Sequence, residues 1–200
     1  MTDRLKAHSF VEIELKMTVS GYSRQRVWLH WLSAAVIMWT LVSGFYVASV
    51  PVSPWIKQSV AFLNVSLTTV FIPFFVWRLF FFVSHARHLS VKPLSRVDSL
   101  VLFAHTLIYL NVSIVLVTGM LMMDRPIDVF GIFEIAQLLS NPELIALFFA
   151  IHVWACVALS LLVALHVGAV ILHEACGHRV LRRMSFCRHR RSERLGMSGP

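Results

Sequence analysis

Residues 145–172 read IALFFAIHVWACVALSLLVALHVGAVIL and contain no Lys, Arg, Asp or Glu. About 20 consecutive apolar residues allow a helix to cross a hydrocarbon core ~30 Å thick, so this stretch predicts a transmembrane helix. It contains His152 and His166, which are fourteen residues apart. An imidazole is costly in hydrocarbon, and a histidine inside a membrane span is therefore a candidate functional residue. At ~1.5 Å per residue the two side chains lie ~21 Å apart on roughly one face of the helix.

The composition of the whole chain also indicates a membrane protein. Of its 200 residues, 58% are hydrophobic and 14% are charged, and the mean hydropathy is +0.74. A soluble domain carries about 25% charged residues, so the surface of this chain does not all face water. The net charge is +8, but the basic residues lie between apolar segments rather than on one compact face. We therefore expect contact with a lipid bilayer and no binding of nucleic acid.

Four segments of the chain are long and apolar enough to span a bilayer, namely residues 27–50, 59–83, 100–123 and 145–172. With this hydropathy, only a helix bundle satisfies every backbone hydrogen bond in lipid. The predicted fold class is therefore all-α, an integral membrane four-helix bundle. The first apolar segment is too long for a cleaved signal peptide, and we expect it to be retained. Pro73 predicts a kink in the second helix.

The distribution of Lys and Arg predicts the orientation of the bundle. Basic residues are frequent before the first span, between the second and third spans, and in the C-terminal tail, whereas the other two loops carry only Lys57 and Arg125. The positive-inside rule then places both termini in the cytoplasm. The predicted organisation is a cytoplasmic N-terminal segment at residues 1–26, a four-helix transmembrane domain at residues 27–173, and a basic cytoplasmic tail at residues 174–200.

The longest external connection, residues 124–141, begins with the turn-like sequence DRPID. The following residues 129–139 are mostly apolar and favour a short helix lying in the membrane interface. By residue count the external loops carry more acidic than basic side chains. The outer face is therefore expected to be mildly acidic.

His30 lies near the cytoplasmic start of the first span, and His166 lies near the cytoplasmic end of the fourth. Two residues at similar depth can face each other across a bundle, and two neutral imidazoles form an axial ligand set for low-spin haem iron. We predict that His30 and His166 bind the iron of one b-type haem. The alternative is that each imidazole only hydrogen-bonds a neighbouring backbone carbonyl. A bis-histidine haem is closed to exogenous ligands, which suits electron transfer.

His152 lies near the outer end of the fourth span, and no other histidine in the chain reaches its level. Because methionine with histidine is an established haem ligand set, three methionines near the end of the third span are candidate partners. They are Met120, Met122 and Met123. The alternative is that these methionines are ordinary packing or lipid-facing residues.

Four further polar residues near the cytoplasmic side have two interpretations each. His105 either orients a haem propionate or a ligand histidine, or lies at the interface without a cofactor role. His173 and Glu174 either donate to a quinone headgroup or are interfacial. Arg78, the only permanent charge within a span, either pairs with a haem propionate or reaches the inner membrane surface with its long side chain.

The C-terminal tail carries Cys176, His178, Cys187 and His189. Cysteine and histidine can bind zinc, but this spacing matches no common zinc module and the surrounding residues are rich in arginine. We expect instead a solvated basic tail against anionic lipid headgroups. Its cysteines are expected to be reduced thiols in the cytoplasm.

The pattern resembles the bacterial cytochrome b561 family, whose best-understood function is superoxide oxidase activity coupled to quinone. The matching elements are residues 26–32 with the sequence His-Trp-Leu, residues 105–110, residues 119–123, and the pair His152 and His166. The resemblance covers roughly residues 24–185. The fourteen-residue histidine pair together with His-Trp-Leu is its most specific part.

The resemblance implies two b haems in a four-helix bundle, with one ligand histidine in the first helix, one in the second and two in the fourth. By position, His30 and His166 hold the cytoplasmic haem, and His152 holds one side of the outer haem. The second-helix ligand falls on Asn64, and an amide is a very poor ligand for haem iron. The outer haem is then absent, five-coordinate at His152, or completed by a methionine. An acidic outer face also argues against efficient oxidation of the superoxide anion.

The leading functional hypothesis is a membrane-bound b-type cytochrome that carries electrons between the quinone pool, with ubiquinone as the candidate quinone, and an unknown redox partner. The resemblance implies a multi-pass protein of the bacterial inner membrane. One alternative is a superoxide oxidase that transfers electrons from superoxide to ubiquinone. Another is a non-redox membrane anchor subunit. The number of haems per chain separates the three, because they require one, two and none.

Overall fold

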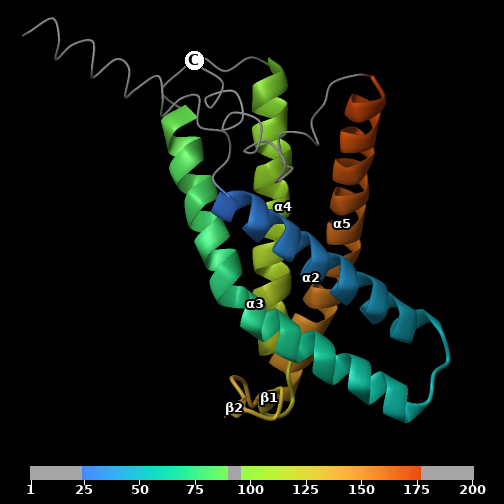
Figure 1. Cartoon of the computed structure of the whole chain (residues 1–200). Helices are drawn as coiled ribbons and strands as arrows, with labels where there is room; N and C mark the ends of the chain where they lie inside the picture. The colour runs from blue at the N-terminus through green and yellow to red at the C-terminus, as the bar shows by residue number, and fades with distance from the viewer. Residues whose placement is uncertain (1–23, 90–95, 177–200) are drawn as a thin grey trace, which may run out of the picture. The chain divides into compact units, whose positions relative to one another are not determined.

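The computed structural model describes residues 24–89 and 96–176 (Figure 1). The chain divides into two units, one made of Met1–Trp28 with Val170–Pro200 and a larger one of Leu29–Ala169. Every contact discussed below lies within the larger unit. Residues 1–23 of the predicted cytoplasmic segment 1–26 and the tail residues His178, Cys187 and His189 lie outside the described residues.

Four long helices make up most of the described chain. They are α2 (Arg24–Ser49), α3 (Pro54–Leu89), α4 (Arg96–Leu121) and α5 (Pro142–Ala175). Each contains a window that is long and apolar enough to cross a membrane. The prediction of an all-α protein with four transmembrane helices is confirmed, and the orientation of the termini stays a prediction.

All four helices begin several residues before the apolar segments predicted from hydropathy, and two of these starts have a capping side chain. α3 starts at Pro54, where the Ser53 hydroxyl accepts a hydrogen bond from the backbone N–H of Ile56 at 3.4 Å. α5 starts at Pro142, where Asn141 Oδ1 accepts from the N–H of Glu143 at 2.9 Å. A capping side chain followed by proline at the first helical position is a strong start signal, because proline lacks only an N–H that would stay unpaired there.

The predicted kink in the second span is present. Pro73 lies inside α3, and Figure 1 shows that the two halves of this helix run in different directions. Proline removes one backbone hydrogen bond, and its ring collides with the preceding turn, so a straight helix is not available. Phe71 and Phe75, on either side of Pro73, nevertheless contact each other, with ring centroids 5.9 Å apart.

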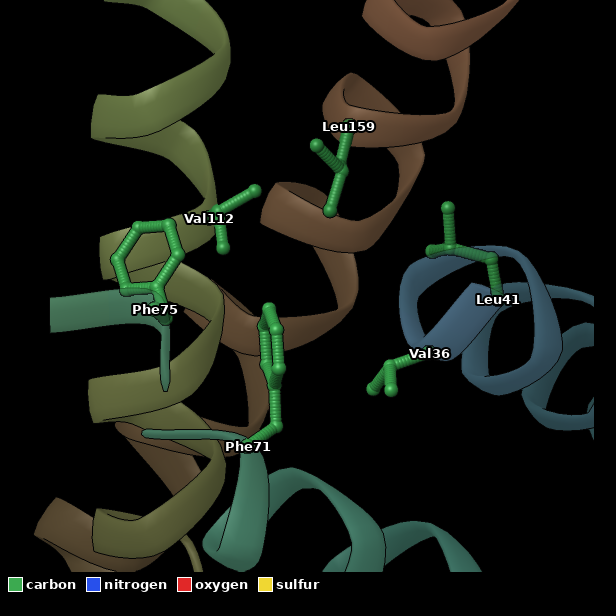
Figure 2. Close-up of a cluster of buried hydrophobic side chains, with 6 residues drawn as sticks. All are labelled: Val36, Leu41, Phe71, Phe75, Val112 and Leu159. Carbon is green, nitrogen blue, oxygen red and sulfur yellow. The ribbon is translucent and has the colours of Figure 1, made fainter. Parts of the chain in front are cut away.

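All four helices contribute side chains to one apolar core (Figure 2). Its buried members are Val36 and Leu41 from α2, Phe71 and Phe75 from α3, Val112 from α4 and Leu159 from α5. Many other large apolar side chains face outward, such as Trp154 on α5, which is 73% exposed. Lipid is as apolar as these side chains, so burial alone gives the helices little reason to associate. Close packing and polar contacts between helices must supply the specificity.

The connection between α4 and α5 is a β-hairpin, and the predicted interfacial helix at residues 129–139 is wrong. Strand β1 (Ile127–Val129) pairs antiparallel with β2 (Phe133–Ile135). The chain reverses at Phe130 and Gly131, whose φ angles are +52° and +69°. Two successive left-handed residues cannot continue a helix, and the alternation in Ile127-Asp128-Val129 buries both apolar side chains of β1 on one face.

Ser66 of α3 joins this hairpin to the bundle. Its hydroxyl donates to the carbonyl oxygen of Asp128 at 3.1 Å and accepts from the N–H of Phe130 at 3.1 Å. The Ser66 side chain is fully buried. One hydroxyl thus satisfies a backbone acceptor and a backbone donor that the short ladder leaves unpaired.

Candidate functional site

The predicted ligand His30 is hydrogen-bonded to the only charged side chain predicted within a span. Nη2 of Arg78 on α3 lies 3.0 Å from Nδ1 of His30 on α2. The Arg78 guanidinium carbon lies 5.2 Å from the centroid of the Tyr109 ring on α4. Arg78 therefore connects three helices, through an imidazole on one side and an aromatic face on the other.

Tyr109 is held in place by aromatic neighbours on α3. Its ring stacks on Phe82 with centroids 4.3 Å apart and contacts Phe75 at 6.1 Å. Phe75 belongs to the apolar core, so the aromatic support of Tyr109 is continuous with that core. The ring is thus a fixed surface for the guanidinium of Arg78.

The second predicted ligand, His166 on α5, contacts another imidazole. Its ring centroid lies 5.3 Å from that of His105 on α4, with the planes at 81°. His105 Nδ1 donates to the carbonyl oxygen of Val101, one turn earlier, at 2.7 Å. This bond fixes the tautomer of neutral His105, with its proton on Nδ1 and a lone pair on Nε2.

His30 and His166 belong to one cluster. His30 contacts Arg78, and Arg78 contacts Tyr109. His105, one turn before Tyr109 on α4, contacts His166, and all of these side chains are only partly exposed. We define the histidine cluster as His30, Arg78, His105, Tyr109 and His166. Three members come from α2 and α4, with both histidines in the early parts of these helices, and two come from the late parts of α3 and α5, as expected when consecutive helices alternate in direction.

The histidine cluster contains donors suited to a metalloporphyrin rather than to a bare metal ion. Within residues 24–89 and 96–176, no three His, Cys, Asp or Glu side chains converge as they must to hold a bare metal ion. A haem iron needs only two axial ligands from the protein. His166 has no hydrogen bond on either ring nitrogen among the described residues, and His30 has one only on Nδ1. The residue types fit a bis-imidazole haem, and His30 would have to release its hydrogen bond from Arg78 to bind the iron. The ligand roles stay predictions.

The third predicted ligand, His152, lies in a separate site where α5 meets α4. Its Nδ1 lies 3.1 Å from the carbonyl oxygen of Val115 and 3.1 Å from the hydroxyl of Thr118. Its Nε2 lies 3.5 Å from the sulfur of Cys156, one turn further along α5. A backbone carbonyl accepts only, so neutral His152 donates from Nδ1 and keeps a lone pair on Nε2.

Gly119 allows α4 to approach the His152 ring. A Cβ atom built on Gly119 would lie 3.2 Å from Cε1 and 3.5 Å from Nδ1 of His152. This contact is tighter than ordinary van der Waals packing of side chains. The absence of a side chain at Gly119 is therefore part of how the His152 ring reaches the carbonyl of Val115.

Asn64, the position that the resemblance assigns to a ligand, makes a contact between helices. Its Oδ1 accepts a hydrogen bond from the Ser43 hydroxyl of α2 at 3.0 Å. An interhelical hydrogen bond of this kind is typical of transmembrane bundles. The proposed methionine partners Met120, Met122 and Met123 lie at the end of α4 and just beyond it, and their ligation of haem stays a prediction.

His173 and Glu174 lie in the last turn of α5, where His173 is exposed and Glu174 is half-buried. Their proposed contact with a quinone stays a prediction. Sequence reasoning missed the pairing of Arg78 with His30 and the roles of Thr118, Gly119 and Ser66. Helical spacing places residues on a face, but which faces meet depends on the rotation of each helix. We find no sequence signal that predicts these contacts.

Four apolar helices that bring together histidines from the first, third and fourth spans define a polytopic membrane protein with a candidate haem site. The family model of prokaryotic cytochrome b561 matches residues 21–186, and the chain belongs to this family. No curated protein gives a significant match. The predicted family is confirmed, and membership identifies the chain as a membrane-bound b-type cytochrome of electron transfer that binds haem b.

Proposed function

We propose that this cytochrome carries electrons between the quinone pool and a redox partner, through one haem b held by His30 and His166. The observation that carries the proposal is the histidine cluster, in which contacts through Arg78, Tyr109 and α4 connect these two side chains from the first and last spans. Each is only partly exposed and lies on a long helix that restricts its movement. Such supported imidazoles are suited to rigid axial ligation.

The chain's own residues define the surroundings of this site. Phe75 and Phe82 support Tyr109 on the α3 side, and His105 packs edge-on against His166. Two neutral imidazoles add no charge to the bundle interior, whereas a carboxylate ligand would. A haem with two histidine ligands supplies one-electron transfer and leaves no position for oxygen or another exogenous ligand.

We propose that His173 and Glu174 interact with the quinone headgroup, with ubiquinone as the candidate. Quinone carbonyls accept hydrogen bonds, and reduction of a quinone takes up protons. Both side chains lie at one end of a transmembrane helix, and one is exposed while the other is half-buried. The distribution of basic residues supports a cytoplasmic location for this end, in a bacterial inner membrane.

A specific observation favours a second candidate, a two-haem superoxide oxidase. A metal-ligating histidine commonly donates its other ring N–H to a backbone carbonyl, and His152 donates from Nδ1 to Val115 while its Nε2 keeps a lone pair. Against it stands Asn64, which makes a hydrogen bond to Ser43. The third candidate, a non-redox anchor, requires that the chain bind no haem.

The deciding experiment is the haem content of detergent-purified protein, measured by pyridine haemochrome together with a reduced-minus-oxidised spectrum. The proposal expects one low-spin haem per chain, loss of the signal in His30→Ala and His166→Ala, and an unchanged signal in the control variant His152→Ala. Two haems, one of them lost in His152→Ala, support the superoxide oxidase. No haem in protein expressed with an adequate haem supply leaves the anchor.

A further inference from the structure

Arg78 carries a permanent charge within a transmembrane helix without a negative partner among the described side chains. Its two contacts are the His30 imidazole and the Tyr109 ring. A charged group inside a membrane bundle is costly, and such groups normally pair with an opposite charge or serve a functional site. A neutral imidazole and an aromatic face only partly compensate a guanidinium.

The direction of the hydrogen bond between Arg78 and His30 determines which ring nitrogen of His30 carries the proton. A guanidinium has five N–H donors and no acceptor, so Arg78 donates and Nδ1 of His30 accepts. The proton of neutral His30 is then on Nε2. In this tautomer neither ring nitrogen has a free lone pair, because one accepts from Arg78 and the other carries the proton. To bind iron through Nε2 as a neutral imidazole, His30 would have to lose its contact with Arg78 and carry its proton on Nδ1 instead of Nε2.

Tyr109 offers the guanidinium of Arg78 an aromatic surface beside His30. Its ring is stacked on Phe82 and lies 5.2 Å from the guanidinium carbon of Arg78. A side chain held against a fixed ring can turn within the histidine cluster without extending to the membrane surface. Once the guanidinium has turned away from His30, its N–H groups can donate two parallel hydrogen bonds to the two oxygens of a carboxylate.

We propose that Arg78 binds a propionate carboxylate of haem b, and that this binding releases His30 to act as a ligand. The inference rests on the proposed haem at His30 and His166. Arg78 in this role is a positioning residue as well as a binding residue, because the same side chain that holds the carboxylate otherwise blocks Nδ1 of His30. Binding of the carboxylate by Arg78 and binding of the iron by His30 are therefore coupled, because both require that the hydrogen bond between Arg78 and His30 be broken.

The test compares two cofactors that differ only in their carboxylates, haem b and its dimethyl ester. Protein purified without haem is titrated with each, and binding is followed by the low-spin absorption spectrum. The wild-type chain is expected to bind haem b more tightly than the ester by roughly tenfold to hundredfold, the range of a hydrogen bond to a charged group. Arg78→Gln is expected to bind both cofactors alike, and Arg78→Lys to retain part of the preference.

Arg87→Gln is the matched control, because Arg87 is an exposed arginine further along the same helix. It is expected to keep the wild-type preference. Circular dichroism and gel filtration identify any variant that fails to fold, and Arg78→Lys then provides the comparison. An undiminished preference for haem b in folded Arg78→Gln or Arg78→Lys overturns the inference while leaving the proposed function intact. Unchanged haem binding in His30→Ala overturns both.

Discussion

Ser66→Ala removes the hydroxyl that attaches the β-hairpin to α3. The change leaves the carbonyl of Asp128 and the N–H of Phe130 without the two 3.1 Å hydrogen bonds they make in the native chain. An unsatisfied buried polar group costs about 1–3 kcal/mol, so two of them cost about 2–4 kcal/mol after partial relaxation. The missing hydroxyl lies in a fully buried position, where water does not easily replace it.

The loss of these two hydrogen bonds is expected to lower the free energy of local opening of the hairpin and to leave the four helices folded. Because 1.4 kcal/mol is a factor of ten, a cost of about 2–4 kcal/mol increases the open population by about 30- to 1000-fold. The reporter is amide hydrogen exchange at Ile132, whose N–H donates to the carbonyl oxygen of Val129 at 3.0 Å. Exchange is measured by mass spectrometry on protein in nanodiscs.

Ser113→Ala is the matched control, because the Ser113 hydroxyl donates only to the carbonyl of Tyr109 in its own helix, at 2.9 Å. That carbonyl keeps its helical partner, so hairpin exchange is expected to match the wild type. Equal exchange at Ile132 in Ser66→Ala and the wild type would refute the assigned role of Ser66.

Two further predictions concern contacts between helices. Gly119→Leu places a side chain where even a Cβ would lie 3.2 Å from the His152 ring, so it should lower the thermal unfolding temperature, whereas Gly168→Ala, with nothing within 4 Å, should not. Unchanged melting of Gly119→Leu in detergent would show that the ring does not pack there. Tyr109→Phe keeps the face beneath Arg78 and should retain normal haem affinity, while Tyr109→Leu removes it and should speed haem transfer to apomyoglobin severalfold. Equal transfer rates in these two variants would contradict the supporting role of the ring.

The four helices were predictable because the absence of charge over a bilayer-spanning length is a strong signal. The first residues of the helices were less predictable, because the capping residues Ser53 and Asn141 lie outside the apolar segments. The hairpin was missed because three-residue strands are too short for a periodicity to stand out. Of the apolar side chains that suggested an interfacial helix, Val129 ends β1, and Phe133 and Ile135 lie in β2.

The candidate site was predictable in its histidines and not in their neighbours. Intramembrane imidazoles are rare enough that His30, His152 and His166 can be selected from the sequence, and alternation of helix direction brings the first and last of them to one end. The hydrogen bond from Arg78 depends on how far α3 is rotated after Pro73, which no residue pattern specifies. The same holds for the packing of His152 on Gly119.

The bend in α3 has a consequence for the membrane in which the chain resides. A straight helix of 36 residues would be about 54 Å long at 1.5 Å per residue, well beyond a hydrocarbon core of about 30 Å. Excess length is accommodated by tilting, kinking or local thickening of the bilayer. With a hinge at Pro73, the half that carries Ser66 can change its inclination while the half that carries Arg78 keeps its place. Bilayers of different thickness should therefore be matched by the first half of α3, leaving the histidine cluster undisturbed.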